Sequence, residues 1–218
     1  GIQLDSNLTL STDTIKGLFS VRNPNFNNTD KSVYARAQAL ETDRLSESGY
    51  KSNKAGFAFG TSFEYQDDLF FGLGQSSFYE KIETNSTAST RQKQQEGNYW
   101  DTFVTLDLDY DKRNQKFKTT DGYRSYYSVD LPIISENNSL TNLYNISYYN
   151  ALYDQNVSKI SLYLKATTSL TNDDVKLSER LYLPSNKLRG FVKGKVGPKD
   201  GDDFIGGNYA ASLNMSST

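Results

Sequence analysis

The side chains that most often carry out covalent chemistry are missing from this sequence. Its 218 residues include no histidine and no cysteine. A Ser-His-Asp triad, a thiolate nucleophile and thiolate metal sites are therefore excluded. Ser158 and Lys159 are adjacent, but they have no supporting context, and we interpret this pair as surface. The candidates that remain are carboxylates and one arginine in a glycine-rich segment.

Two groups of carboxylates have the composition of a cation site. The run Asp200-Gly-Asp-Asp203 resembles the start of a calcium loop, but residues 204–211 contain no closing carboxylate. We therefore predict a solvated turn there. The second group alternates with other residues along one stretch: Asp101, Asp107, Asp109 and Asp111. We expect these carboxylates to line a polar face, and we predict neither a metal nor a cofactor.

The arginine lies in a long glycine-rich connection, residues 171–207, within Leu188-Arg189-Gly190-Phe191. A hairpin needs only about two to five residues, and long loops on rigid scaffolds often carry function. A guanidinium on such a loop can fold back into a polar lumen and pair with carboxylates. We hypothesise that Arg189 pins the loop there, that Gly190 permits a special turn, and that Phe191 anchors the tip by burial. The alternative is a solvent-exposed arginine in a flexible loop.

The elements that position these groups are strands, because apolar and polar residues alternate with a period of two. The stretches are Ile2–Leu10, Ile15–Arg22, Val33–Ala39, Phe57–Tyr65, Leu69–Lys81, Trp100–Tyr110, Tyr123–Ile133, Asn142–Tyr153, Lys159–Ala166 and Asn208–Met215. We expect about ten residues per strand, which is the length that spans a tilted path through a bilayer. Strands of soluble proteins average about 5–6 residues.

Composition agrees with strands that have one wet and one apolar face. The hydrophobic fraction is 36%, below the roughly 45–50% of soluble domains. Tyrosine and phenylalanine are nevertheless abundant, at 16 and 12 residues. We predict an all-β fold, an antiparallel transmembrane β-barrel. The alternative is a soluble β-sandwich, in which strands are shorter and turns recur every 8–12 residues or so.

The connections are expected to differ in length, as they do in outer-membrane barrels. Short turns alternate with three longer polar segments, Asp43–Asn53, Glu83–Asn98 and Thr171–Asp203. The net charge of -2 and the lack of basic runs give no indication of nucleic acid. Because the sequence starts at Gly1 rather than Met, we expect a processed or truncated piece of a longer protein.

Four motifs in order resemble the BamA family of outer-membrane protein assembly factors. They are Ser20-Val-Arg-Asn-Pro-Asn-Phe26, Thr119-Thr-Asp-Gly-Tyr-Arg124, Leu188-Arg-Gly-Phe191, and Val196-Gly-Pro-Lys199 with Asp203-Phe-Ile-Gly-Gly-Asn-Tyr-Ala210. Thr119 stands where the family usually has proline. The resemblance implies that residues 1–218 form a partial barrel, about ten strands, the third to the twelfth, of a sixteen-stranded one.

Residue roles also follow from the resemblance. Leu188, Arg189, Gly190 and Phe191 match the R-G-F motif of the long sixth extracellular loop. The segment that leads from this loop into the next strand is matched by Gly197, Pro198, Asp203, Gly206, Gly207 and Asn208. In the family the loop arginine contacts a motif on strand thirteen, which would lie beyond Thr218.

The function implied by the resemblance is the insertion of client β-barrel proteins into the Gram-negative outer membrane, without covalent chemistry or ATP. Such a protein is not an enzyme. Its implied partners are outer-membrane lipids, unfolded client barrels, and accessory lipoproteins bound through POTRA domains absent from this chain. Two alternatives remain: a related two-partner secretion or TamA-like transporter, and a soluble β-domain that binds glycans through its many tyrosines.

Overall fold

The protein is described by a computed structural model that covers residues 1–11, 13–136, 138–153, 156–192 and 194–217. Ten long strands form one antiparallel sheet in which each strand pairs with the next along the chain, and β12 follows β9. The strands are β1 (Gln3–Leu10), β2 (Thr14–Asn23), β3 (Ser32–Arg44), β4 (Tyr50–Gln66), β5 (Leu69–Thr84), β6 (Gly97–Asp111), β7 (Gly122–Ile134), β8 (Ser139–Tyr153), β9 (Asn156–Ser169) and β12 (Tyr209–Ser217). The prediction of an all-β antiparallel fold is confirmed.

Short elements occupy the connections. They are the helices α1 (Leu45–Ser48) and α2 (Thr90–Lys93), the 3-10 turns η1 (Phe26–Asn28) and η2 (Leu177–Glu179), and a hairpin of β10 (Lys199–Asp200) and β11 (Asp203–Phe204). The hairpin contains the predicted solvated turn, with Gly201 at φ 64°. No helix in the part of the chain that the structure describes is long and apolar enough to cross a membrane.

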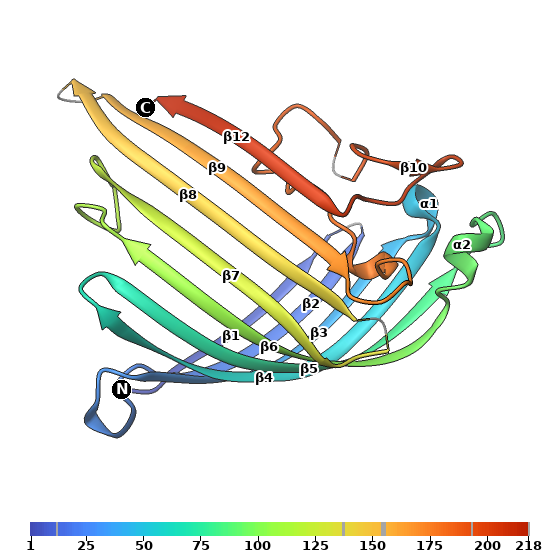
Figure 1. The fold of residues 1–218 in the computed structure, drawn as a ribbon, viewed down its shortest axis with the longest axis horizontal. Coiled ribbons are helices and arrows are strands. Elements are labelled where there is room, and N and C mark those ends of the chain that lie inside the picture. Colours follow the sequence, from blue (N-terminus) through green and yellow to red (C-terminus); the bar gives the residue numbers. More distant parts are fainter. Residues whose placement is uncertain (12, 137, 154–155, 193, 218) are drawn as a thin grey trace.

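The sheet curves into an open trough with β1 and β12 as its two edge strands (Figure 1). The connection between β9 and β12 lies over the concave side, at the end where α1 and α2 are found (Figure 1). Strand β2 ends at Asn23, directly before Pro24, because proline cannot donate to the ladder.

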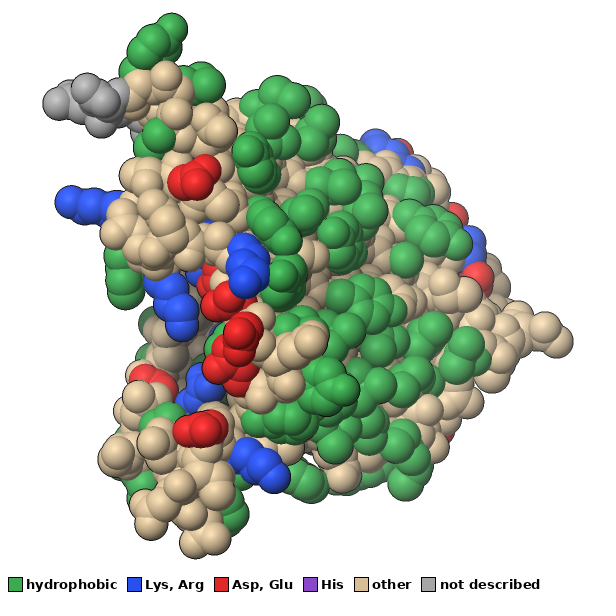
Figure 2. All heavy atoms as spheres, turned by 60° about the vertical axis from the view of Figure 1, so that its left-hand side comes forward, with side chains coloured by type: hydrophobic (Ala, Val, Ile, Leu, Met, Phe, Trp, Pro, Cys, Tyr) green, Lys and Arg blue, Asp and Glu red, His purple; other side chains and the backbone are tan. Residues whose placement is uncertain are grey.

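Register explains why one face of the sheet is apolar. Residues directly opposite each other in antiparallel strands share a face, and one such row joins Phe59, Gln75, Val104 and Leu131. Large apolar side chains of this convex face remain exposed, among them Phe57, Phe59, Leu73, Leu108, Leu131, Ile160, Leu164 and Leu213. Figure 2 shows hydrophobic side chains gathered in a broad patch, with charged side chains at its borders. Such a band is what a lipid-facing barrel wall requires.

One of the three predicted long polar segments, Asp43–Asn53, is wrong, because strands occupy most of it. Strand β3 continues to Arg44 and β4 begins at Tyr50, so only residues 45–49 lie outside strands. By contrast, β5 ends at Thr84 and β6 begins at Gly97, so residues 85–96 form a long connection as predicted. Backbone pairing does not depend on side-chain polarity, and cross-strand charge pairs support these ends. One of them joins Lys51 Nζ and Glu41 Oε1 at 2.7 Å.

Candidate functional site

The concave face carries the polar half of the alternation. Three of the four alternating aspartates have partners on this wall: Asp107 accepts from Tyr126 Oη at 2.7 Å, and Asp109 and Asp111 each pair with an arginine, Arg124 and Arg113. Among the described residues, no group of three or more acidic, His or Cys side chains is arranged to hold a metal ion. The aspartates therefore act in hydrogen bonds and ion pairs along the wall.

The fourth aspartate belongs to a buried ionic cluster that joins the wall to the β9–β12 connection. Lys176, which comes from the connection, forms an ion pair with Asp101 on β6. Its Nζ lies 2.9 Å from Glu80 Oε2 on β5 and 3.6 Å from Glu179 Oε1. The side chains of Lys176, Glu80 and Asp101 are fully buried. We call these four residues the Lys176 cluster.

Hydroxyl groups complete the shell of the Lys176 cluster. Ser52 Oγ donates to Glu80 Oε1 at 2.5 Å, and Ser178 Oγ donates to Glu80 Oε2 at 2.9 Å. Ser135 Oγ donates to Asp101 Oδ1 at 2.6 Å. The ammonium of Lys176 also lies 4.9 Å from the centre of the Tyr99 ring. Buried charges are tolerated only when paired and hydrogen-bonded in this way.

Burial and charge act in opposite directions on the two ionisable groups that the connection contributes. Burial alone would lower the pKa of Lys176, but the carboxylates of Glu80, Glu179 and Asp101 outweigh it and raise that pKa. Burial raises the pKa of Glu179, and the nearby Lys176 and Lys54 do not offset it. Lys176 is therefore held as a cation. The ionised form of Glu179, the third carboxylate beside this ammonium, is disfavoured.

Apolar contacts surround the same point of attachment. Leu177 is buried in a cluster with Tyr50 and Ile82, and Tyr99 packs against this cluster. The backbone N–H of Leu177 donates to Gln95 Oε1 at 2.8 Å. The start of the connection is thus fixed by ion pairs, by hydrogen bonds and by apolar burial together.

A second set of contacts ties both the start and the later part of the connection to α2 and to the end of β3, and links two parts of the connection to each other. Ser89, the N-cap of α2, donates from Oγ to Asp200 Oδ2 at 2.6 Å. Arg91 and Asp174 form a forked ion pair. Tyr182 Oη donates to the carbonyl of Phe204 at 2.8 Å, and the Arg44 guanidinium lies 4.1 Å from the Tyr182 ring.

The predicted R-G-F motif lies in a less constrained part of the connection. Leu188 is half-buried, Arg189 and Gly190 are exposed, and the side chain of Phe191 is 62% exposed. None of the ion pairs found within the described ranges involves Arg189. Gly190 has φ 83°, a backbone conformation that favours glycine. The predicted burial of Phe191 is wrong among the residues that the structure describes, whereas the pinning role of Arg189 stays a prediction.

The segment after the motif contacts the rest of the connection through its backbone. The carbonyl of Pro198 accepts from Ile205 N at 3.1 Å, and Gly207 exchanges two backbone hydrogen bonds with Leu181. The carbonyl of Asn208 accepts from Thr167 N at 2.8 Å, which leads the chain into β12. Gly197 is exposed at φ 131°.

Two positions in this segment are tightly packed. A Cβ on Gly49 would come 2.6 Å from Asp203 Oδ2, so the Asp203 carboxylate lies against the backbone at the end of α1. Gly206, at φ 72°, has no room for a side chain, since a Cβ would lie 3.0 Å from the Leu181 carbonyl oxygen. The backbone conformation and the close approach both explain why glycine occupies this position.

Sequence reasoning did not find Lys176, Glu80 or Glu179. Asp101 was visible in the alternating pattern, but its partner lies 75 residues further along the chain. Lys176 follows Asp173-Asp174-Val175 in a polar stretch and has no local feature that separates it from a solvated lysine. Lys176 differs from a solvated lysine only because the folded connection places it beside β5 and β6.

Comparison with known proteins identifies a family. The domain model of the Omp85 superfamily matches residues 1–217. This chain belongs to the Omp85 superfamily. Among solved structures it is similar to BamA from Haemophilus ducreyi lacking POTRA domains 1-3, with a TM-score of 0.83 and 21% sequence identity. The match covers 100% of this chain and 47% of that chain, and no curated protein matches.

The Omp85 assignment confirms the resemblance to a BamA-like partial barrel and the location in the outer membrane. The chain spans about half the length of the solved relative. The alternative of a soluble glycan-binding domain has no support in this family, and the exposed apolar band suits lipid contact instead.

Proposed function

We propose that this chain is part of the barrel of an assembly factor that inserts client β-barrel proteins into the outer membrane. The observation that carries the proposal is the β9–β12 connection, which lies over the concave face and is attached there by the buried Lys176 cluster. An ordered connection of this kind stiffens one wall of the barrel. The Omp85 membership and the BamA-like fold support the same role.

The mechanism we propose uses no covalent step. An unpaired strand edge presents a row of N–H and C=O groups to which a client strand can add. Local thinning of the bilayer beside the barrel would lower the cost of inserting that strand. Client barrels and membrane lipids would then be the partners, and accessory lipoproteins would bind to POTRA domains outside this chain.

In this proposal Arg189 pairs with a carboxylate contributed by a part of the full-length protein outside this chain. Its exposed position on the concave side leaves the guanidinium accessible to such a partner. Gly190 and the R-G-F match support the assignment, and the segment Gly197, Pro198, Asp203, Gly206, Gly207 and Asn208 would hold the loop in register with β12.

The test replaces Arg189 in the full-length protein, in cells where it is the sole copy. We expect Arg189→Ala to lower the amount of other barrel proteins in the outer membrane and the temperature at which the barrel loses its compact, heat-modifiable form. A charge-assisted pair is worth about 1.5–3 kcal/mol. Lys118→Ala, which removes an exposed cation from the β6–β7 turn, serves as the control. Unchanged client levels and heat stability in Arg189→Ala would remove the proposed role.

The second candidate is a transporter of the same superfamily, because the Omp85 match does not by itself separate assembly factors from secretion pores. The same strains distinguish the two. Loss of many unrelated barrels indicates assembly, whereas loss of one secreted substrate with normal barrel levels indicates transport.

A further inference from the structure

A groove of about 840 Å³ opens on the convex face, beside the turn between β4 and β5 and away from the Lys176 cluster. Two register rows place it on the lipid side: Leu69, Tyr110 and Ser125 are directly opposite one another, as are Phe71, Leu108 and Tyr127. It is lined by Tyr65, Gln66, Asp67, Leu69, Leu108, Tyr110, Lys112, Ser125 and Tyr127.

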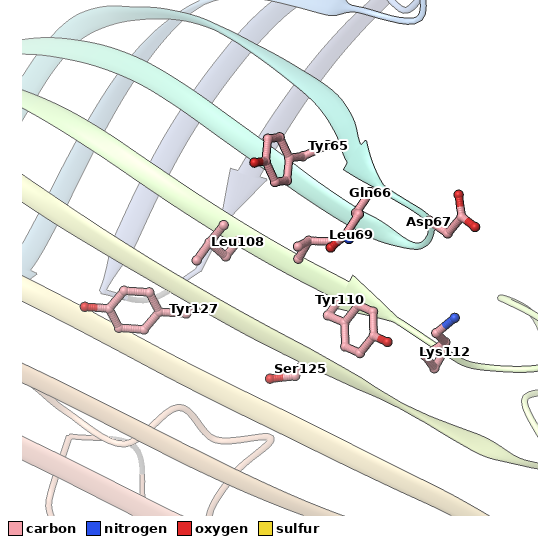
Figure 3. A pocket seen from close by; sticks show the side chains of 9 residues that line it. All are labelled: Tyr65, Gln66, Asp67, Leu69, Leu108, Tyr110, Lys112, Ser125 and Tyr127. Atoms are coloured by element: carbon pink, nitrogen blue, oxygen red, sulfur yellow. The ribbon is translucent and has the colours of Figure 1, made fainter.

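The groove changes from polar to apolar along its length. Figure 3 shows Asp67 and Lys112 at one end, beside the β4–β5 turn, and Leu108 and Tyr127 at the other end, along the strands. Tyr65 and Tyr110 lie between the two ends (Figure 3). Tyrosine is favoured where an apolar layer meets water, because its ring is apolar and its hydroxyl is not. The gradient matches that of a phospholipid, with a polar head and apolar chains.

The charges at the polar end favour a particular head group. Lys112 Nζ pairs with Asp68 Oδ2 at 2.6 Å, so its ammonium is already partly neutralised. Asp67 takes part in none of the ion pairs within the ranges that the structure describes. Two carboxylates and one ammonium therefore leave an excess of negative charge at the mouth of the groove. A purely anionic lipid would meet this charge with repulsion.

We propose that this groove binds the head group of a phosphoethanolamine lipid. The primary ammonium of the lipid donates to the Asp67 carboxylate, and its phosphate accepts from Lys112 and from tyrosine hydroxyls. The acyl chains follow Leu69 and Leu108 into the bilayer. A choline head group carries the same charge and is attracted to tyrosine rings, but it has no N–H to donate. The inference depends on the outer-membrane location and not on the proposed assembly activity, so either can fail alone.

The test measures lipid adducts by native mass spectrometry on the full-length protein. Delipidated protein in detergent is mixed with equal amounts of dioleoyl phosphatidylethanolamine, phosphatidylcholine and phosphatidylglycerol. We expect phosphatidylethanolamine adducts to dominate. Asp67→Asn should weaken them by roughly tenfold, the effect of one charge-assisted hydrogen bond. It should weaken phosphatidylcholine less, because choline has no N–H to donate, and it should not weaken phosphatidylglycerol. Lys112→Gln should weaken the adducts of all three lipids, because each carries the phosphate.

The matched control is Asp30→Asn, which removes an exposed carboxylate from the β2–β3 connection at the same end of the sheet. This variant should bind the three lipids as the unchanged protein does. Equal adducts of all three lipids, a preference for phosphatidylglycerol, or equal losses in Asp67→Asn and Asp30→Asn would each overturn the proposal.

Discussion

Two cations of one connection have opposite surroundings. Lys176, at its start, is fully buried and faces three carboxylates, two of which come from the barrel wall. Arg189, thirteen residues further along the sequence, is exposed, and no ion pair within the described ranges includes it. The base of the connection is therefore complete within this chain, whereas its tip is open to a further partner.

The different surroundings of Lys176 and Arg189 indicate that the base attaches the connection to the barrel wall and that the tip is where function is expected. A buried ion pair is costly to break, since the charges that remain have lost their water and their partner. The Lys176 cluster accordingly fixes where the connection begins, and the tip can change its contacts without detaching the base. Substitutions at the base should therefore affect stability first, and substitutions at the tip should affect client assembly.

The largest effect is expected for Lys176→Met. The change leaves Glu80 and Asp101 buried without a cation, which costs about 3–5 kcal/mol. The measurement is the temperature at which the full-length barrel loses its heat-modifiable form, together with protease cleavage in residues 170–208. Lys118→Met, at an exposed turn, is the control and should change neither. A Lys176→Met protein as stable as the control would mean that the cluster does not attach the connection.

A matched glycine pair compares the packed end of the connection, just before β12, with its tip. Gly206 and Gly190 both have positive φ, at 72° and 83°, so alanine carries a backbone cost of about 1–2 kcal/mol at either. At Gly206 a Cβ would also approach the Leu181 carbonyl oxygen and the Tyr182 ring, whereas nothing lies within 4 Å at Gly190. We expect Gly206→Ala to lower the melting temperature clearly more than Gly190→Ala. Equal decreases in melting temperature would show that the backbone at Leu181 and Gly207 can shift to accommodate the added Cβ at little cost.

The smallest effect is expected for Glu179→Gln. Burial raises the pKa of Glu179, so the penalty of ionising it is fully present above that raised pKa. The penalty disappears as the pH falls toward the ordinary value of about 4.3. Glutamine removes it, and we expect a gain of about 1 kcal/mol or less, or about 2–4 °C, at neutral pH.

The pH dependence provides the check on Glu179. Melting temperatures of the unchanged protein should fall slightly as the pH rises through the raised pKa, and Glu179→Gln should lose this part of the dependence. Glu136→Gln, an exposed glutamate of the β7–β8 connection, should retain it. A Glu179→Gln protein that is less stable at neutral pH would show that the carboxylate is a required partner of Lys176.

The strands could be predicted from sequence because each strand residue faces either lipid or lumen. The stretch 100–110 assigns Val104 and Leu106 to one face and Asp101 and Asp107 to the other, and the register confirms it. The ends of the strands could not be predicted in this way. Polar residues such as Lys51 and Glu83 lie within β4 and β5, where backbone pairing continues although the alternation of polarity has ended.

Alternation along the chain, the absence of histidine and cysteine, and the R-G-F motif were sufficient to determine the class of fold, exclude a Ser-His-Asp triad and thiolate chemistry, and indicate the family. These properties are local or depend on composition, so a linear pattern contains them. The attachment of the β9–β12 connection was decided only by the tertiary structure. It depends on Lys176 meeting Glu80 and Asp101 across the concave face, and the pairing energy arises from their shared burial, which no spacing along the chain specifies.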